Sequence, residues 1–160
     1  MEMVVELGAE HAEAAAALWA EAGLVRPWND PQGDFLRAVS GRTSAVLGVI
    51  GMLDDAGAGT AEPVPALRGT AMVGADGHRG WVYYVAVRPQ DRGQGLGALL
   101  MAAAEDWLRQ AGAPKVQLMV RTTNAAVVGF YERLGYADQH TSVLGKFLDP
   151  ELEALRRSHG

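Results

Sequence analysis

The segment from Val85 to Leu100 constrains the fold most, because it is typical of a strand, a glycine-rich turn and a helix start in direct succession. The first N–H groups of a helix lack acceptors within it, and its aligned dipoles place about half a positive charge there. Gly93, Gly95 and Gly97 let the backbone approach a ligand closely, and Arg92 adds a charged donor. The segment therefore predicts a diphosphate site, with a plain helix cap as the alternative.

Composition limits the chain to a single domain over residues 1–160, since 160 residues that are 49% hydrophobic suit one compact core. A net charge of −5 argues against nucleic-acid partners, so an anion site must be local. The absence of cysteine excludes thiolate chemistry, and four histidines without ligand spacing predict no metal. No secretory signal or long apolar run is present, which predicts a cytoplasmic protein without a membrane partner.

Periodicity and turn residues predict strands alternating with helices along the chain. Asp30 is expected to cap a short helix near Phe35 and Leu36. The strands expected from β-branched and aromatic residues lie at 3–7, 44–52, 69–75, 81–87, 115–121 and 142–148. Longer helices are expected at 12–22, 96–112 and 124–134, with a flexible hairpin loop at 54–67 and a charged tail.

Two other glycine-rich phosphate sites compete with this interpretation. Gly93, Gly95 and Ala98 satisfy the dinucleotide pattern G-x-G-x-x-G/A. In that fold the first glycine follows the first strand almost directly, whereas here four residues separate Val87 from the turn and the motif lies past the midpoint of the chain. A P-loop also fails, because no Lys followed by Ser or Thr comes after the glycines.

The turn has the form Gln/Arg-x-x-Gly-x-Gly/Ala, met by Arg92, Gly95 and Gly97, and the later segment VRTTNAAVVGFYERLGY follows at a suitable separation. Together they resemble the GCN5-related N-acetyltransferase (GNAT) superfamily over nearly the whole chain. RPWNDP, DGHRGWVYYVAVRP and VVGFYERLGY most resemble its YpeA-type acetyltransferases, which are related to the ribosomal-protein N-terminal acetyltransferases. The resemblance implies an α+β fold in which about four helices flank a mixed, mostly antiparallel sheet of six to seven strands.

This resemblance implies an N-acetyltransferase that uses acetyl-CoA and no metal. An amine would attack acetyl-CoA directly in a ternary complex, without a covalent enzyme intermediate. The acceptor would be a small primary amine, a protein N-terminus or a lysine, and the enzyme a monomer or homodimer. The alternative is a noncatalytic acyl-CoA sensor.

The resemblance also assigns roles to the residues that would contact acetyl-CoA. Val85, Ala86 and Val87 would pair with the pantetheine arm, and the backbone N–H near Val85 would polarise the thioester carbonyl. Asn124 would reach the pantetheine or cap a helix, and Tyr131 would protonate the departing CoA thiolate or pack in the core. The pyrophosphate would be held by Arg92, Gly93, Gln94, Gly95, Leu96, Gly97 and Ala98.

The general base stays unassigned, because Met119 occupies the position at which related N-terminal acetyltransferases carry a glutamate. A water chain, a substrate amine of low pKa or another residue must then take the proton. Tyr83 and Tyr84 are expected to point to opposite faces of one strand. The residues near enough in sequence or strand to act as base are Asp76, His78, Tyr83 and Tyr84. The residues expected to contact the acceptor are Trp28, Asp30, Asp76, His78, Tyr83 and Tyr84.

Overall fold

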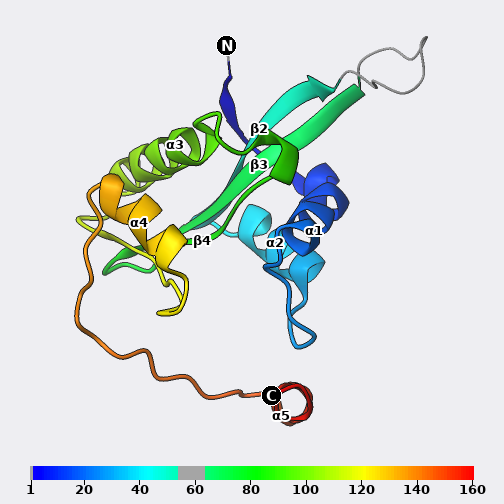
Figure 1. The fold of residues 1–160 in the computed structure, drawn as a ribbon, viewed down its shortest axis with the longest axis vertical. Helices are drawn as coiled ribbons and strands as arrows, with labels where there is room; N and C mark the ends of the chain where they lie inside the picture. The colour runs from blue at the N-terminus through cyan, green and yellow to red at the C-terminus, as the bar shows by residue number, and fades with distance from the viewer. Residues whose placement is uncertain (1, 54–63) are drawn as a thin grey trace. The chain divides into compact units, whose positions relative to one another are not determined.

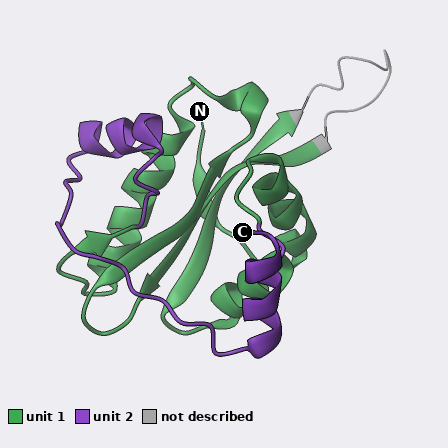
Figure 2. Cartoon of the chain, turned by 60° about the horizontal axis from the view of Figure 1, so that its bottom comes forward, with its two compact units in different colours: residues 1–25, 30–118 green, residues 26–29, 119–160 purple. Residues whose placement is uncertain are grey.

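The structure, a computed structural model, describes residues 2–53 and 64–160. The chain divides into two compact units, coloured separately in Figure 2. The first consists of Met1–Val25 and Asp30–Leu118, and the second of Arg26–Asn29 and Met119–Gly160. The predicted diphosphate site therefore belongs to the first unit, whereas Asn124 and Tyr131 belong to the second.

The first unit is built on a sheet with the strand order β1-β2-β3-β4-β5 (Figure 1). Neighbouring strands from β1 to β4 are antiparallel, and β5 is parallel to β4. The strands are β1 (Val4–Glu6), β2 (Ser44–Leu53), β3 (Val64–Ala75), β4 (Gly80–Val87) and β5 (Val116–Gln117). The predicted mixed, mostly antiparallel sheet is confirmed, but among the described residues it has five strands rather than six to seven.

Helices cover both faces of this sheet. Figure 1 shows α3 (Leu96–Gln110) on one face and α1 (Ala12–Glu21) and α2 (Pro31–Ser40) on the other. Trp19 of α1 and Phe35 of α2 are fully buried, as is Leu100 of α3. Two short 3-10 turns, η1 (Ala9–His11) and η2 (Pro89–Asp91), complete the unit. η2 is the only element between β4 and α3, so it sets the path of the chain from the strand to the helix.

Side-chain caps start two of the helices as their sequences predict. The Gly33 N–H donates to Asp30 Oδ1 at 3.1 Å at the start of α2. In the second unit, the Val127 N–H donates to Asn124 Oδ1 at 3.3 Å and begins α4 (Ala125–Arg133). Each bond satisfies one N–H group that has no acceptor within its helix.

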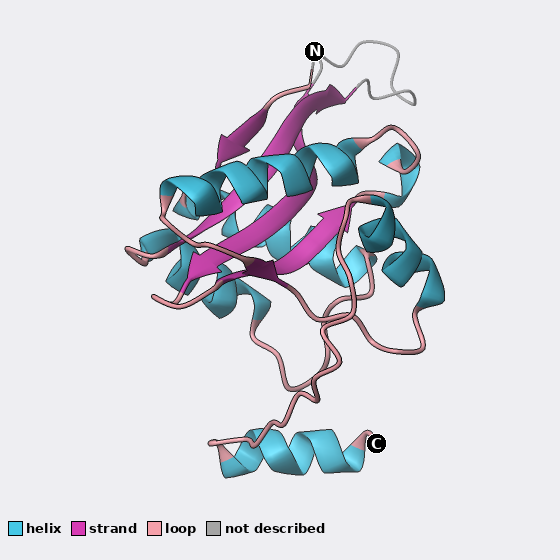
Figure 3. Cartoon of the chain, turned by 90° about the vertical axis from the view of Figure 1, so that its left-hand side faces the viewer, coloured by secondary structure: helices cyan, strands magenta, loops and turns pink. Residues whose placement is uncertain are grey.

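The predicted strand at 142–148 is wrong. This segment is a loop in Figure 3, and Val143, Leu144 and Leu148 are 70%, 93% and 92% exposed. Its apolar residues resemble a strand pattern, but a strand also needs a neighbour that accepts its backbone hydrogen bonds. The charged tail forms a fifth helix, α5 (Pro150–Ser158), with Asp149 as its cap.

Two other boundaries differ from the predictions. β3 begins at Val64, so the predicted loop at 54–67 is wrong at its end, and residues 54–63 lie outside the described part of the chain. Pro65 stands one residue into β3, near the strand end, where a missing N–H costs little. The predicted strand at 115–121 is reduced to the two residues of β5.

Candidate active site

The glycine turn has the backbone conformation that its sequence predicts. Gly93 and Gly95 have φ of +79° and +80°, and nothing lies within 4 Å of a Cβ added at either position. Glycine is therefore required for its backbone angle rather than for space, since a side chain in this region costs about 1–2 kcal/mol. The first α3 bond runs from the Leu99 N–H to the Gly95 carbonyl at 3.1 Å. The N–H groups of Leu96, Gly97 and Ala98 precede it.

This helix end fits a diphosphate. Gly95 is its N-cap and supplies no side-chain cap, and Arg92 is exposed without an ion pair among the described residues. Leu96 is 2% exposed, so its side chain is buried and is not offered to a ligand. Exposed backbone donors, a positive dipole end and an available guanidinium together suit phosphate oxygens.

A charged cluster holds the turn in place, and it was not predicted from the sequence. Arg88 Nε donates to Asp91 Oδ2 at 2.6 Å, and Arg68 Nη2 donates to Asp91 Oδ1 at 3.3 Å. Arg68 also donates to Gln94 Oε1 at 2.9 Å and to Glu2. We call Glu2, Arg68, Arg88, Asp91 and Gln94 the Asp91 cluster. Gln94 is among the residues predicted to hold the pyrophosphate, and its side-chain oxygen accepts this hydrogen bond from Arg68.

The electrostatics of this cluster keep Asp91 ionised. Burial raises the pKa of the Asp91 carboxyl, but hydrogen bonds from Arg68 and Arg88 outweigh burial and hold the pKa below its usual value. The Arg88-x-x-Asp91 spacing in RPQD is the local signal for this ion pair. The contacts of Arg68 come from a distant strand and have no comparable signal.

A bulge interrupts β4 before the turn. Thr70 pairs with Ala86 and Met72 with Tyr83, so Tyr84 and Val85 together oppose the single residue Ala71. Such an extra residue disrupts the ladder locally. The pairing between β4 and β5 reaches only Trp81 with Gln117. The end of β4 that contains Val85 is therefore beyond its described pairing with β5.

Tyr84 is held in the core at this bulge, with φ of +51°. Its ring stacks on Trp19 at a centroid distance of 3.8 Å, and its hydroxyl donates to Asp34 Oδ2 at 2.6 Å. Burial, the hydrogen bond to Asp34 and that carboxylate's charge raise the pKa of Tyr84. A tyrosine that holds its proton this firmly is a poor general base.

Asp76 serves a turn. Its Oδ1 accepts the N–H groups of His78 and Arg79, both at 2.8 Å, and its Oδ2 accepts from Trp81 Nε1 at 3.2 Å. The bonds from Arg79 and His78 lower the pKa of Asp76, which weakens it as a base. Tyr83 is 43% exposed. Its pKa is raised mainly by partial burial and to a lesser extent by the negative charge of Asp76.

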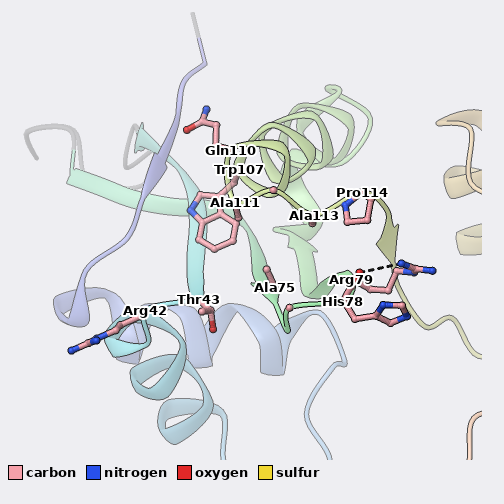
Figure 4. Close-up of a pocket in the computed structure, with 12 residues that line it drawn as sticks. Arg42, Thr43, Ala75, His78, Arg79, Trp107, Gln110, Ala111, Ala113 and Pro114 are labelled. Atoms are coloured by element: carbon pink, nitrogen blue, oxygen red, sulfur yellow. Dashed lines mark hydrogen bonds between the residues drawn. The ribbon is translucent and has the colours of Figure 1, made fainter.

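His78 lines a separate cavity of about 470 Å³. Figure 4 shows Trp107 and Gln110 at its wall and the side chains of Arg42 and Arg79 pointing away from each other. The cavity lies at the C-terminal end of α3, and a 15-residue helix is about 22 Å long. The structure therefore does not bring His78 together with the glycine turn.

The second unit contains the other predicted site residues. Tyr131 is 8% exposed, and burial raises its pKa to about 12. Its ring packs edge-on against those of Phe130 and Tyr136, with ring centroids 4.9 Å and 5.7 Å apart. Met119 is 50% exposed and offers no proton acceptor. Trp28 lies in a turn in which the Asn29 N–H donates to the Arg26 carbonyl at 2.9 Å.

Comparison with known families decides the identity of this arrangement. The model of the acetyltransferase (GNAT) family matches residues 6–136, which is most of the chain. The chain belongs to the GNAT acetyltransferase family. A curated relative, an acetyltransferase of Yersinia enterocolitica, is 40% identical over 136 residues, covering 85% of this chain and 88% of the relative.

Solved structures show the same fold. An aminoglycoside N-acetyltransferase in complex with CoA has a TM-score of 0.72 at 13% identity, covering 93% of this chain and 96% of its own. A ribosomal-protein-alanine N-acetyltransferase from Brucella melitensis has a TM-score of 0.66 at 19% identity, covering 91% and 99%. The predicted GNAT fold is confirmed, as is the enzyme class, an N-acetyltransferase that uses acetyl-CoA.

Metal-ligand clusters and membrane-spanning helices are both lacking in the described residues. No group of three or more His, Cys, Asp or Glu side chains there is arranged to hold a metal ion. None of the helices that the structure describes has both the length and the apolar character needed to cross a membrane.

Proposed function

We propose that the enzyme transfers an acetyl group from acetyl-CoA to a primary amine by direct attack in a ternary complex. The observation that carries the proposal is the structure of the chain from β4 to α3. β4 has a bulge beyond its pairing with β5, and the chain then leads through η2 and the glycine turn to the N-terminus of α3, which has no side-chain cap. The family match over residues 6–136 runs through both compact units, which supports one acetyltransferase domain.

The glycine turn is assigned to the pyrophosphate. The backbone N–H groups from Gly93 to Ala98 would donate to its oxygens, and Arg92 would add charge. Gln94 contributes its backbone, because its side-chain oxygen is engaged by Arg68. Acetyl-CoA supplies the activated acetyl thioester when bound, and the turn fixes its position relative to β4.

The end of β4 is assigned to the reacting part of the donor. Ala86 and Val87 would hydrogen-bond the pantetheine arm through their backbone, and the Val85 N–H would face the thioester carbonyl. Negative charge grows on that oxygen as the amine attacks. A donor that is already oriented stabilises this charge without rearranging, which lowers the barrier.

Asn124 is assigned to the pantetheine and Tyr131 to the departing thiolate. Asn124 already caps α4 through Oδ1, so its amide nitrogen is the group offered to the ligand. Tyr131, with a pKa of about 12, stays protonated at neutral pH. Full proton transfer to a thiolate whose acid has a pKa of about 8.5 is uphill by about 5 kcal/mol. Tyr131 therefore acts chiefly by donating a hydrogen bond to the thiolate.

The structure reduces the number of candidates for the general base, and the acceptor is proposed only as a chemical class. Tyr84 and Asp76 are unsuited to accept a proton. Each already makes hydrogen bonds, and the pKa of Tyr84 is raised whereas that of Asp76 is lowered. A water chain or an amine of low pKa would meet this need. The acceptor is a small primary amine, a protein N-terminus or a lysine, in keeping with structural neighbours named for aminoglycosides and ribosomal-protein alanine.

Thiol release from acetyl-CoA tests this function. The acceptor panel contains an aminoglycoside, a peptide with N-terminal alanine, a lysine peptide and small primary amines, and calorimetry measures CoA affinity in parallel. We expect saturable CoA binding and amine-dependent thiol release. Tight CoA binding without turnover on any acceptor would favour the noncatalytic sensor, and failure to bind CoA would contradict both functions.

A further inference from the structure

The carbonyl of Tyr84 is held by a buried pair of side chains. Thr70 Oγ1 donates to the Tyr84 carbonyl oxygen at 2.9 Å, and Trp19 Nε1 donates to the same Thr70 hydroxyl at 2.8 Å. Thr70 and Trp19 are both 0% exposed. Because the Thr70 hydroxyl has one proton, accepting from Trp19 commits that proton to the Tyr84 carbonyl.

The side chain of Tyr84 is held by the same region of the core. Its ring stacks on Trp19 with an interplanar angle of 12°, and its hydroxyl bonds Asp34 of α2. Trp19 therefore contacts Tyr84 twice, through the ring directly and through Thr70 at the carbonyl. Three residues, Trp19 of α1, Asp34 of α2 and Thr70 of β3, thus hold Tyr84 in a left-handed conformation that tyrosine rarely adopts.

This backbone unit carries the N–H of Val85. The Tyr84 carbonyl and the Val85 N–H belong to one planar peptide group, which is trans because the described chain contains no cis peptide bond. In a trans peptide the C=O and N–H bonds point in opposite directions. A hydroxyl that fixes the direction of the carbonyl also fixes the direction of the N–H on the other side of the plane.

We propose that Thr70 is a positioning residue, which orients the Val85 N–H toward the thioester carbonyl by holding the Tyr84 carbonyl, with Trp19, Tyr84 and Asp34 as its support. The inference rests on the proposed function, in which that N–H stabilises the developing charge. Thr70, Trp19 and Asp34 were not among the residues predicted from sequence, whereas Tyr84 was predicted near the acceptor.

Thr70→Val tests the proposal, because it keeps the shape of the side chain and removes the hydroxyl. We expect kcat to fall about 10- to 50-fold while the KM for acetyl-CoA stays within twofold, since the lost interaction acts on charge formed during the reaction. Thr70→Ser restores the hydroxyl and should keep kcat within threefold of the wild type. Leu108→Ala, in the core on the α3 side of the sheet, controls for lost stability and should leave kcat within twofold.

The support from Asp34 has its own matched pair. Asp34 accepts from Tyr84 through Oδ2 and from Arg37 Nη2 through Oδ1 at 2.7 Å. Asp34→Ala and Tyr84→Phe should each lower kcat about 5- to 20-fold, whereas Arg37→Ala should leave it within twofold. The Asp34→Ala/Tyr84→Phe double variant should be no slower than the slower single variant, because each substitution removes the same hydrogen bond between Tyr84 and Asp34.

A spectroscopic measurement separates this inference from the proposed function. In the wild type, the amide proton shift of Val85 should differ between complexes with acetyl-CoA and CoA, and this difference should shrink by about half or more in Thr70→Val. If the wild type turns over and folded Thr70→Val has the same kcat, the positioning role is overturned and the proposed function stands. If the wild type does not turn over, the Val85 amide proton shift decides. An equal shift difference between the acetyl-CoA and CoA complexes in both proteins would then overturn the positioning role.

Discussion

At the scale of single residues, Gly95 and Gly112 form a matched pair at opposite ends of α3. Their φ angles are +80° and +82°, and a Cβ at either position meets nothing within 4 Å. Valine at either site should therefore cost a similar backbone strain of about 1–2 kcal/mol. Only Gly95→Val should weaken CoA binding, by at least about tenfold in Kd, because the proposed function places the pyrophosphate at that end only.

Calorimetry with CoA and thermal unfolding of both variants check this prediction. Gly112→Val should lower the melting temperature about as much as Gly95→Val and leave the Kd for CoA within twofold. Unchanged CoA affinity in a folded Gly95→Val variant would show that the turn is only a helix cap.

Tyr131 carries a second prediction at this scale. Tyr131→Phe keeps the edge contacts of the ring and removes the donor, so kcat should fall about 10- to 100-fold with little change in the KM for acetyl-CoA. Tyr136→Phe is the control on a neighbouring ring and should leave kcat within twofold. Steady-state kinetics decide, and equal turnover in Tyr131→Phe would leave Tyr131 a packing role.

The raised pKa of Tyr131 predicts how stability depends on alkaline pH. Its phenol ionises near pH 10 in the unfolded chain and near pH 12 in the folded one. The stabilisation from this group is complete below pH 10 and is lost as the pH rises from about 10 to 12. Urea unfolding across this range should show a smaller alkaline loss in Tyr131→Phe than in the wild type.

At the scale of secondary-structure elements, the Asp91 cluster ties η2 to β3. Asp91→Asn removes a charged acceptor for Arg68 and Arg88 and should lower the free energy of unfolding by about 2–3 kcal/mol. Asp106→Asn is the control, because Asp106 and Arg109 form an exposed pair at 2.6 Å that should contribute less than about 1 kcal/mol. Urea unfolding at pH 7 measures both.

The depressed pKa of Asp91 gives this prediction a pH dependence. Its contribution is complete above the unfolded pKa of about 3.9 and is lost as the pH falls through the lower folded pKa. The difference in unfolding free energy between the wild type and Asp91→Asn should therefore shrink in acid. A difference that stays constant from pH 7 to pH 3 would contradict the assignment.

Elements defined by nearby residues could be predicted from the sequence. Asp30, Asn124 and the positive-φ glycines act on residues within three or four positions, so their roles are written locally. The helix α5 has equally local signals, with Asp149 as cap, Pro150 in the first turn and Arg156 and Arg157 in the last, and these were missed. The strand expected at 142–148 failed because local composition says nothing about a pairing partner.

The parts of the site that could not be predicted depend on residues far apart in the chain. The hydrogen bonds from Tyr84 to Asp34 and from Trp19 to Thr70 span 50 and 51 positions, and the one from Arg68 to Asp91 spans 23. Periodicity indicates which face of an element is buried but not which side chain it meets there. Tyr84 was therefore a candidate for the acceptor site, although its hydroxyl donates a hydrogen bond to Asp34 and so anchors the bulge in the core.

At the scale of the whole molecule, the proposed function gives an acidic chain a local anion site. The net charge of −5 would repel a polyanionic ligand at long range, but that repulsion is screened beyond about 8–10 Å at physiological salt. Backbone N–H groups and Arg92 act within hydrogen-bond distance, where the dipole of α3 is strongest. Composition therefore excludes broad anionic partners without excluding a single diphosphate.

Ligand-linked stability of the whole chain separates binding from positioning. CoA at 100 times its Kd should add about 2.7 kcal/mol to the free energy of unfolding, raising the melting temperature by about 5–10 °C. At that same CoA concentration Gly95→Val should lose about half or more of this stabilisation, because its Kd is at least tenfold higher. Thr70→Val should keep all of it, because Thr70 orients a group that acts only on the acetyl carbonyl, which CoA lacks. A smaller shift in Thr70→Val would mean that Thr70 supports CoA binding itself, contrary to the positioning role.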